Sequence, residues 1–326
     1  MTKTPSFQRR SVAALLAAVC TATALPLWAQ SGSNTVKLIV GYAPGGPVDA
    51  SARVFAPVLS RELGQPVIVE NRPGAGGAVA GASVVKAAPN GLEIFYAASP
   101  TMTISPHVLK AMTFDPLKDM TPLATILSYA NVLVINQNQP FKTLPELVAF
   151  GKANPGKLAY GSAGMGASNH LSGELFARRA GITMTHVPYK GNAPAMTDVM
   201  GGQIQMMFDI VGGAKSHIDG GKVRALAVTS KDRNPALPQL PSMTELGVRD
   251  YDVGGWYGLY GPLGMSAELS QKIAAATARA LQDPELSKRW VDQGYVIWNA
   301  KPADLADRMR REHALWAEVT KGMVFE

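Results

Sequence analysis

The sequence TVKLIVGYAPGGPVDASAR, residues 35–53, contains a predicted strand, a glycine-rich loop and the start of a predicted helix. The β-rich run Val36–Val40 enters a loop that holds Gly45 and Gly46, and the helix is expected to begin near Asp49. The first N–H groups of a helix have no partner within the helix, and the helix dipole adds partial positive charge there. This arrangement predicts an anion-binding loop.

A second stretch of the same kind follows at residues 158–177, LAYGSAGMGASNHLSGELFA. Neither 41–52 nor 161–177 contains Lys or Arg. An anion held there would be bound by backbone N–H groups, hydroxyl groups and water. A tight turn would explain either loop alone, but two in matching contexts favour two lobes that meet over one small anion in a closed cleft.

The surrounding elements predict an α/β fold. Strands are expected near 36–40, 66–70 and 92–98, with helices between them, a spacing typical of βαβ units and a largely parallel sheet. Residues 99–105, SPTMTIS, follow the third strand, at the edge where open α/β sheets bind ligands. We therefore expect Ser99 and Thr101 near the ligand, although an ordinary capping turn explains the segment equally well.

The order of the elements predicts two lobes. A first crossing is expected near 125–132, and the proline-rich and charged residues 230–250 form the expected return linker. The predicted domains are residues 30–128 with 252–326 for one lobe and 129–251 for the other. Two helices, near 266–282 and 302–321, are expected to end the chain as cladding of a lobe.

Residues 1–29 are predicted to be a cleaved signal peptide. Lys3, Arg9 and Arg10 precede an apolar stretch of about 14 residues, which is too short to span a bilayer as an anchor, and Ala29 provides a small residue for cleavage. The single cysteine, Cys20, lies in this segment behind a bulky valine, which disfavours lipidation. The mature chain of roughly 300 residues would then lack cysteine, and we expect it in the periplasm.

Composition and motifs argue against several functions. The formal net charge is +7 without a Lys- or Arg-rich run, so nucleic-acid binding is not indicated. The dinucleotide, phosphate-loop and H-E-x-x-H motifs do not occur, and the five histidines are expected to stand singly, as isolated surface or core residues. We expect neither a metal nor a cofactor.

One motif leaves an enzymatic alternative open. Residues 160–164, YGSAG, resemble the nucleophile elbow G-x-S-x-G, with Ser162 as the candidate nucleophile. Tyr160 replaces the first glycine and would crowd the tight turn, and His170 follows too soon to match the usual order of partners. A serine hydrolase is therefore the weaker alternative.

Three further residues are candidates with structural alternatives. Asp49 is expected either to cap its helix or to accept a hydrogen bond from a ligand amine or a water molecule. Asp209 ends the otherwise apolar run QIQMMFD and is expected to face the cleft. Trp256 is expected to form an apolar wall of the cleft or, alternatively, to pack in the core.

These features together resemble the receptors of tripartite tricarboxylate transporters, also called TctC or Bug receptors. The landmarks are PGGPVD at 44–49, GQPVIVENRPGAGG at 64–77, GSAGMGASNHLSGELF at 161–176, VPYKG at 187–191, GGQIQMMFD at 201–209 and VRALAVTS at 223–230. The resemblance covers essentially the whole mature chain.

The resemblance implies a type II periplasmic-binding-protein fold, in which two Rossmann-like lobes joined by two crossover segments close over the ligand. It implies that the loops matching 41–49 and 162–170 hold one carboxylate, partly through ordered water. Val48 departs from the family, which often has Thr or Ser there. The implied ligand-binding residues, with the candidates above, are Tyr42, Ala43, Gly45, Gly46, Asp49, Ser99, Thr101, Ser162, Ala163, Gly164, Ser168, Asn169, His170, Asp209 and Trp256.

The predicted function is a monomeric, non-enzymatic receptor for a small carboxylate. The resemblance implies a dicarboxylate, a tricarboxylate, an acidic amino acid or an aromatic acid as ligand, and delivery to the membrane subunits of a tripartite tricarboxylate transporter. A ligand-sensing receptor for a signalling system is the alternative that the sequence does not separate from transport.

Overall fold

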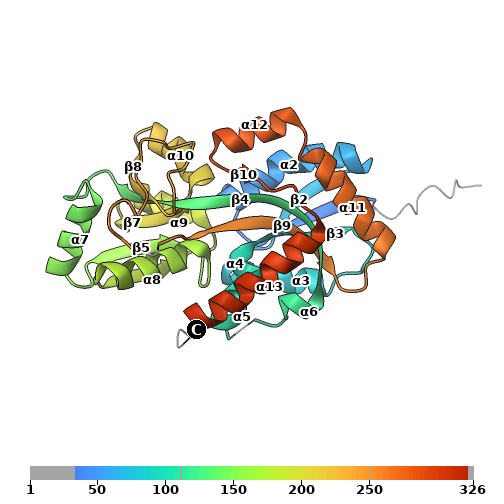
Figure 1. Cartoon of the computed structure of the whole chain (residues 1–326), viewed down its shortest axis with the longest axis horizontal. Coiled ribbons are helices and arrows are strands. Elements are labelled where there is room, and N and C mark those ends of the chain that lie inside the picture. The colour runs from blue at the N-terminus through green and yellow to red at the C-terminus, as the bar shows by residue number, and fades with distance from the viewer. Residues whose placement is uncertain (1–33, 111, 250, 322–326) are drawn as a thin grey trace, which may run out of the picture. The chain divides into compact units, whose positions relative to one another are not determined.

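The computed structural model describes residues 34–110, 112–249 and 251–321. The predicted signal peptide lies outside these residues. Thr35 begins a single compact unit that contains every helix and strand described below. Its sheet has ten strands in the order β2-β1-β3-β9-β4-β7-β5-β6, with β8 and β10 each paired to β4 (Figure 1).

The first βαβ units form as predicted. β1 (Val36–Val40) pairs in parallel with β2 (Val67–Asn71) and with β3 (Glu93–Ala98). Between β1 and β2 lies α2 (Pro47–Leu63), which begins two residues before the expected Asp49 because Pro47 occupies its first turn. Pro57 lies within α2 on its exposed side, where a missing N–H is tolerated.

Short helices connect β3 to the next strand. The 3-10 turn η2 (Ala75–Gly77) and α3 (Ala78–Val85) precede β3, whereas α4 (Ser99–Thr103), α5 (Ser105–Val108) and α6 (Pro116–Asp119) follow it. The hydroxyl-rich segment after β3 is therefore helical rather than a simple turn.

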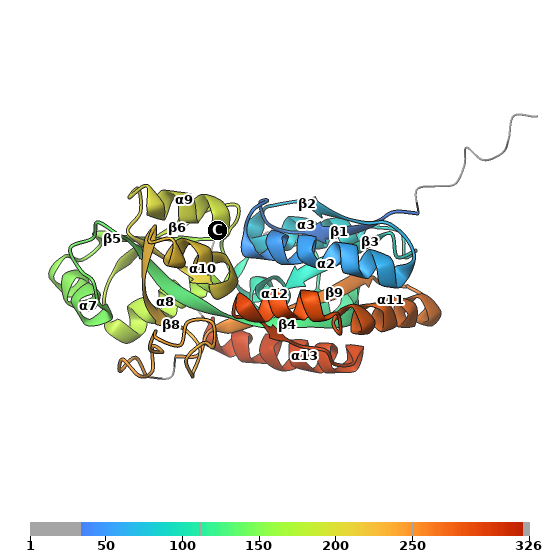
Figure 2. The ribbon, with the colours of Figure 1, turned by 90° about the horizontal axis from the view of Figure 1, so that it is seen from above.

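One long strand, β4, runs through both ends of the sheet (Figure 2). β4 (Met120–Asn136) pairs with β9 (Gly254–Pro262) up to Ala130, and from Asn131 onward it pairs with β7 (Met206–Ile210) and β8 (Val223–Val228). These pairs are antiparallel, so the sheet is mixed and not largely parallel as predicted. The two apolar runs expected near 125–132 belong to one continuous strand that changes partners.

The middle of the chain repeats the strand–loop–helix pattern. β5 (Leu158–Ser162) pairs in parallel with β6 (Met184–Pro188) and β7. The helices are α7 (Leu144–Ala153), α8 (Ser168–Ala180), α9 (Asn192–Met200) and α10 (Val211–Asp219). The predicted capping box of α7 is present, and Gly181 ends α8 in the left-handed conformation.

The C-terminal region holds one helix more than predicted. α11 (Ala267–Ala280) and α13 (Pro302–Val319) match the expected helices, but α12 (Pro284–Asp292) and the short β10 (Val296–Ile297) lie between them. Trp290 of α12 is fully buried and stacks on Phe55 of α2 with ring centroids 5.9 Å apart. The C-terminal helices therefore clad the β1–β3 end of the sheet.

Two sets of apolar clusters build the core. One set joins β1, β3 and the C-terminal helices, whereas the other joins residues of β5, β7 and β8 with those of α7, α8 and α9. Among the described residues, none of the helices combines the length and apolar character needed to cross a membrane.

Candidate functional site

A small cavity lies at the carboxyl ends of β1, β3, β5 and β7. Its volume is about 10 Å³, which leaves room for about one water molecule, so the loops around it must separate to admit a ligand. The residues that line it are Tyr42, Val48, Ala98, Pro100, Tyr129, Ala163, Ala167, Ser168, Asn169, Asn192 and Ile210. We call this space the cleft cavity.

Four helices of eight or more residues begin at the cleft cavity. Val48 lies in the first turn of α2, Ser168 and Asn169 open α8, Asn192 opens α9, and Ile210 is the N-cap of α10. The partial positive ends of their dipoles therefore converge on one space. The lining contains no Lys, Arg or His, so an anion there would meet neutral donors and helix N-termini.

Asn169 is held by its own loop. Its Oδ1 accepts hydrogen bonds from the Ala163 N–H at 3.0 Å and from the His170 N–H at 3.1 Å. The side chain is 2% exposed. Because both bonds use the amide oxygen, the Nδ2 group points away from them, and its N–H groups are the donors left for other acceptors.

Tyr42 lines another part of the cleft cavity, and Thr101 supports it. The Tyr42 hydroxyl donates to the Gly76 carbonyl at 2.9 Å, and the Thr101 Oγ1 donates to the same carbonyl at 2.7 Å. Burial raises the pKa of Tyr42 to about 12, so its hydroxyl keeps its proton near neutral pH. Thr101 does not line the cleft cavity and acts behind Tyr42.

Asp49 organises the first glycine-rich loop. Its Oδ2 accepts from the Gly45 N–H at 2.9 Å, and its carboxylate also accepts from Arg53 and Asn71. Burial would raise the pKa of Asp49, but these hydrogen bonds together hold it below its usual value. Asp49 is therefore a charged anchor of the loop, next in sequence to the cleft-lining Val48, and the N-cap position belongs to Gly46.

Asp209 lies behind Asn192. The Asn192 Nδ2 and the Ile210 N–H both donate to Asp209 Oδ1. Asp209, Gly45 and Gly46 line a neighbouring cavity, and Asn192 lines both that cavity and the cleft cavity. Burial raises the pKa of Asp209 to about 7, only partly offset by the two donors.

Ser162 and His170 lie beneath the second glycine-rich loop. Ser162 Oγ is 2.6 Å from His186 Nε2, and the rings of His170 and His186 stack with centroids 3.9 Å apart. The expectation that the histidines stand singly is therefore wrong, since His107 and His313 also pair, at 4.1 Å. Within the described part of the chain, no three His, Cys, Asp or Glu side chains could hold a metal together.

The Ser162–His186 contact does not open onto a substrate space. Ser162 is completely buried, and its hydroxyl also bonds the Gly164 carbonyl at 3.1 Å. His170 Nδ1 accepts from the Gly166 N–H at 3.1 Å. Both side chains thus fix the shape of the loop, while Ala163 of that loop lines the cleft cavity.

Ser99 and Trp256 are hydrogen-bonded to each other and do not line the cleft cavity. The Trp256 N–H donates to Ser99 Oγ at 3.1 Å, and its indole Nε1 donates to Glu312 of α13 at 2.8 Å. Trp256 is fully buried in the cluster with Phe95 and Leu305. For Trp256 the structure matches the packing alternative.

Each of the two glycine-rich loops also meets a segment distant from it in sequence. The Ala43 N–H donates to the Lys190 carbonyl at 2.8 Å. A Cβ on Gly164, whose φ is +128°, would lie 3.1 Å from the Gly76 nitrogen. The backbones therefore approach too closely for side chains at this point.

Sequence analysis missed several lining residues, chiefly Tyr129 and Asn192. Burial raises the pKa of Tyr129, and its hydroxyl interacts with Ser168 and Ser99. Asn192 follows Gly191 after a strand, which is the same strand–glycine–helix signal that identified the two loops. Tyr129 carries no such signal, because it lies within β4 where the strand changes partners.

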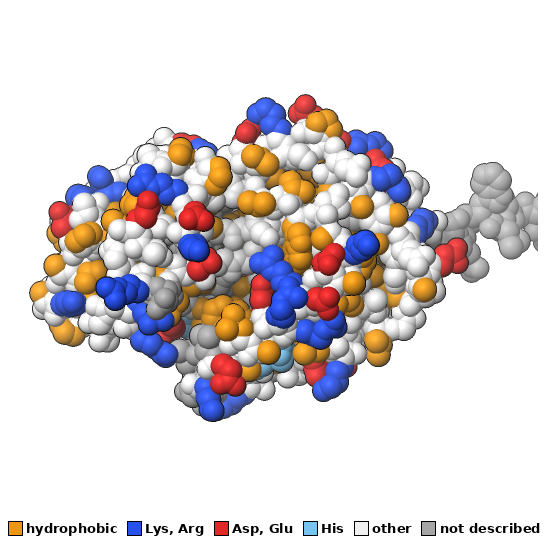
Figure 3. Space-filling view, in the orientation of Figure 1, with side chains coloured by type: hydrophobic (Ala, Val, Ile, Leu, Met, Phe, Trp, Pro, Cys, Tyr) orange, Lys and Arg blue, Asp and Glu red, His pale blue; other side chains and the backbone are white. Residues whose placement is uncertain are grey.

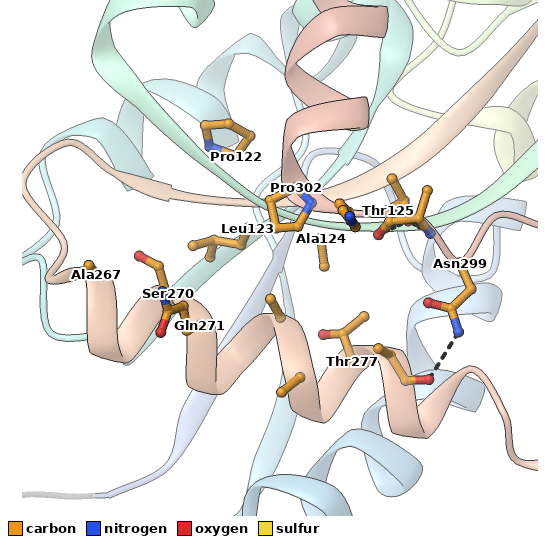
Figure 4. A pocket seen from close by; sticks show the side chains of 15 residues that line it. Pro122, Leu123, Ala124, Thr125, Ala267, Ser270, Gln271, Thr277, Asn299 and Pro302 are labelled. Atoms are coloured by element: carbon orange, nitrogen blue, oxygen red, sulfur yellow. Dashed lines mark hydrogen bonds between the residues drawn. The ribbon is translucent and has the colours of Figure 1, made fainter.

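A wider groove lies elsewhere, between β4, α11 and the residues before α13 (Figure 4). Its lining is mostly small and apolar, with Leu123 and Ala124 on one side and Ala267 and Ser270 on the other. The Asn299 amide bonds the Ala278 carbonyl at 3.1 Å. This groove lies away from the carboxyl ends of β1, β3, β5 and β7, so we do not take it as the candidate site.

Charged side chains do not gather into one field on the face shown in Figure 3. Lys and Arg are interspersed with Asp and Glu over both ends of the sheet. Many of these charges are paired locally, as Lys215 is with Asp219 at 2.7 Å.

Comparisons with known proteins agree with this geometry. The family described as "Tripartite tricarboxylate transporter family receptor" matches residues 51–323. A Cupriavidus necator protein named for the gbd 5′ region is 36% identical over 94% of each chain.

Two solved structures with ligands are also similar. MatC of Rhodopseudomonas palustris with bound malate is 31% identical, with a TM-score of 0.84 over 87% of this chain and 98% of its own. An R. palustris protein with adipate is 30% identical, with a TM-score of 0.85 over 88% and 96%. The fold is therefore that of periplasmic binding proteins, and the chain belongs to the tripartite tricarboxylate transporter receptor family.

Proposed function

We propose that this chain is a periplasmic receptor that captures a small organic carboxylate and delivers it to a membrane transporter of the tripartite tricarboxylate type. The observation that carries the proposal is the convergence of four helix N-termini on the cleft cavity, which lacks cationic side chains. Several neutral donors must act together in such a site, because one exposed dipole contributes only about 0.3–1 kcal/mol.

The ligand is a carboxylate whose remainder is small. The malate and adipate of the two similar structures have this character. The donors available here are the Asn169 amide, the hydroxyls of Ser168 and Tyr129 and the first N–H groups of α8. Val48 and Ile210 make part of the lining apolar, so that part would contact hydrocarbon.

Binding is proposed to close two lobes, residues 30–128 with 252–326 and residues 129–251. The change of partners in β4 between Ala130 and Asn131, together with the start of β9 at Gly254, supports this division. The Ala43–Lys190 hydrogen bond joins one proposed lobe to the other, as expected for a closed state. Closure would exclude water, and the receptor is proposed to act as a monomer.

The receptor is proposed to bind without catalysis. Ser162 is buried and its hydroxyl is bonded within its own loop, which disfavours a nucleophilic role. Ser162→Ala should leave a carboxylate ligand chemically unchanged, as the wild type does, on prolonged incubation. Turnover of an ester by the wild type that Ser162→Ala abolishes would contradict this part of the proposal.

A thermal-shift screen of residues 30–326 tests the ligand class. The panel contains dicarboxylates, tricarboxylates, acidic amino acids and aromatic acids, with the matching methyl esters as controls. A ligand at 100 times its dissociation constant should stabilise the protein by about 2.7 kcal/mol, a shift of several degrees. A shift with acids but not with esters supports the proposal, whereas equal shifts with both contradict it.

The cellular location has a separate test. We expect the exported protein to begin after Ala29, which N-terminal sequencing of a periplasmic extract would show. Recovery of the intact 326-residue chain from the cytoplasm alone would contradict export.

A further inference from the structure

The carboxyl group of Asp209 is buried close to the proposed anion site without a cation beside it. It is 2% exposed, and both hydrogen bonds that it accepts come from neutral N–H groups, on Asn192 and Ile210. Within the described residues, Asp209 forms no ion pair. A buried ionised carboxylate with only neutral partners is destabilised relative to its protonated form.

The titratable groups on the elements packed around Asp209 do not change this charge balance. They are Tyr160 on β5, His170, Glu174, Arg178 and Arg179 on α8, Asp198 on α9, Lys215, His217 and Asp219 on α10, Asp49, Arg53, Arg61 and Glu62 on α2, and Tyr295 before β10. Lys215 pairs with Asp219, and Arg53 pairs with Asp49. Burial lowers the pKa of His217 and raises that of Tyr295, so both are neutral near pH 7.

Asn192 is the only described residue shared by the linings of the cleft cavity and the cavity that Asp209 faces. Its Nδ2 donates to Asp209, and the amide oxygen, about 120° away around Cγ, is then directed elsewhere. An amide oxygen facing the cleft would repel a ligand carboxylate, whereas an amide N–H would bind it. The orientation of this one side chain therefore matters for the affinity of the site.

We propose that Asn192 contacts the ligand carboxylate and that Asp209 is a positioning residue whose protonation turns the Asn192 amide toward the ligand. A protonated Asp209 donates its O–H to Asn192 Oδ1, which reverses the hydrogen bond and directs Nδ2 into the cleft. The proton comes from solvent and returns there when the ligand leaves. This inference rests on the proposed function, because it requires an anion in the cleft cavity.

Electrostatic repulsion also predicts that a bound carboxylate favours the protonated form of Asp209. The ligand carboxylate and the Asp209 carboxylate would occupy one positive field at the starts of α9 and α10. A second negative charge nearby raises the pKa of Asp209 beyond the increase due to burial, so the bound protein holds a proton that the free protein has partly lost at pH 7.5. The affinity should then fall as pH rises above about 7, by up to about tenfold per pH unit.

Titration calorimetry with malate and with adipate as probes measures this proton directly. Titrations at pH 7.5 in two buffers of different ionisation enthalpy give the number of protons taken up. The free carboxyl group is about one-quarter protonated at pH 7.5, so the wild type should take up between about half and three-quarters of a proton per ligand. Asp209→Asn can donate to Asn192 Oδ1 at every pH, so it should bind without proton uptake and more tightly than the wild type at pH 8.

Asp198→Asn is the matched control, since Asp198 lies on α9 and accepts a hydrogen bond from Tyr189 at 2.6 Å outside both cavities. It should keep the wild-type proton uptake. Asn192→Ala, which keeps the carboxyl group, should lower the affinity and flatten its pH profile, and it serves if Asp209→Asn does not fold.

The outcomes separate the inference from the proposed function. Binding without proton uptake in the wild type, or proton uptake that persists in Asp209→Asn, would overturn the inference and leave the receptor function in place. If neither probe nor any other carboxylate binds, the proposed function fails and this inference fails with it.

Discussion

Gly76 lies where the two glycine-rich regions approach each other. Its φ is +59°, and a Cβ there would be 2.5 Å from the Met165 carbonyl oxygen. Its own carbonyl accepts from Tyr42 and Thr101. One residue thus combines a left-handed backbone, a close backbone approach and support for the cavity wall.

We expect Gly76→Ala to weaken carboxylate binding by at least about tenfold, because the added methyl group separates the loops that must meet around the ligand. Gly64→Ala is the control, since Gly64 also has a positive φ of +71° but no atom within 4 Å of an added Cβ. Both variants should lose about 1–3 kcal/mol of stability from backbone strain. Calorimetric titration separates them, and equal affinities would contradict the role of Gly76.

The stacked histidines predict how the fold responds to acid. Burial lowers the pKa of His170 to about 3 and that of His186 to about 4. In the unfolded chain both groups bind a proton below about pH 6.5. Because the unfolded state then holds more protons, the free energy of unfolding should fall as pH drops from about 6.5 toward 4.

His186→Gln tests this, because the Gln amide can replace Nε2 in the contact with Ser162 without titrating. Its midpoint temperature should change less between pH 7 and pH 4.5 than that of the wild type. His217→Gln is the control on α10, where the pKa shift is smaller. A wild-type acid dependence that His186→Gln leaves intact would contradict the assignment.

At the scale of the elements, β4 and β9 decide how the sheet is divided. The pairing of β4 with β9 ends at Ala130, and Thr229 forms hydrogen bonds to the segments that meet there. The Asn131 N–H donates to Thr229 Oγ1 at 2.9 Å, and the Thr229 hydroxyl bonds the Val253 carbonyl at 2.5 Å. All of these atoms lie in segments where the strands change partners.

Thr229→Val keeps the shape of the side chain but removes these hydrogen bonds. It should lower the free energy of unfolding by about 1–3 kcal/mol, because the Asn131 N–H is left buried without a partner. Thr121→Val, on β4, loses one bond to the Pro262 carbonyl at a partly buried position and should cost less. Urea denaturation compares them, and equal losses would argue against a special role of Thr229.

How far the sequence predicts these elements depends on whether the signal is local. The Thr143–Glu146 capping box and the left-handed Gly181 are local signals, and both predictions are confirmed. The continuity of β4 depends on its partners β7, β8 and β9, which are distant in sequence, so two short runs were predicted. α12 was missed although Asp283 and Pro284 form a recognisable helix start.

The residues of the candidate site also differ in whether the sequence could predict them. Tyr42, Ala163, Ser168 and Asn169, which the family resemblance implies as ligand-binding residues, line the cleft cavity, and they lie in loops that follow strands. Whether Ser99 or Trp256 faces a ligand depends on packing against β9 and α13, which no local pattern reveals. Tyr129 and Asn192 reach the cavity through tertiary contacts and were not predicted.

At the scale of the whole unit, the hydrogen bond from Ala43 to Lys190 reports closure. Amide hydrogen exchange at Ala43 should slow on addition of a carboxylate ligand, because the proposed closure would hold this hydrogen bond formed. The Val36 amide, bonded to the Pro66 carbonyl beside β2, should exchange equally slowly in both states. Exchange at Ala43 that a bound ligand does not slow would contradict closure over the ligand.

The central claim is that neutral donors and helix N-termini bind a carboxylate without a cationic side chain. The most direct test is a calorimetric titration of residues 30–326 at low and at high salt. The two ligands are a carboxylate that stabilises the protein in the thermal-shift screen and the methyl ester of that carboxylate. The account predicts that the acid binds and that the ester does not. It also predicts that the affinity for the acid changes little with salt, because no Lys, Arg or His side chain lines the cleft cavity and salt therefore has no ion pair there to screen. Equal binding of acid and ester, or an affinity for the acid that collapses at high salt, would contradict it.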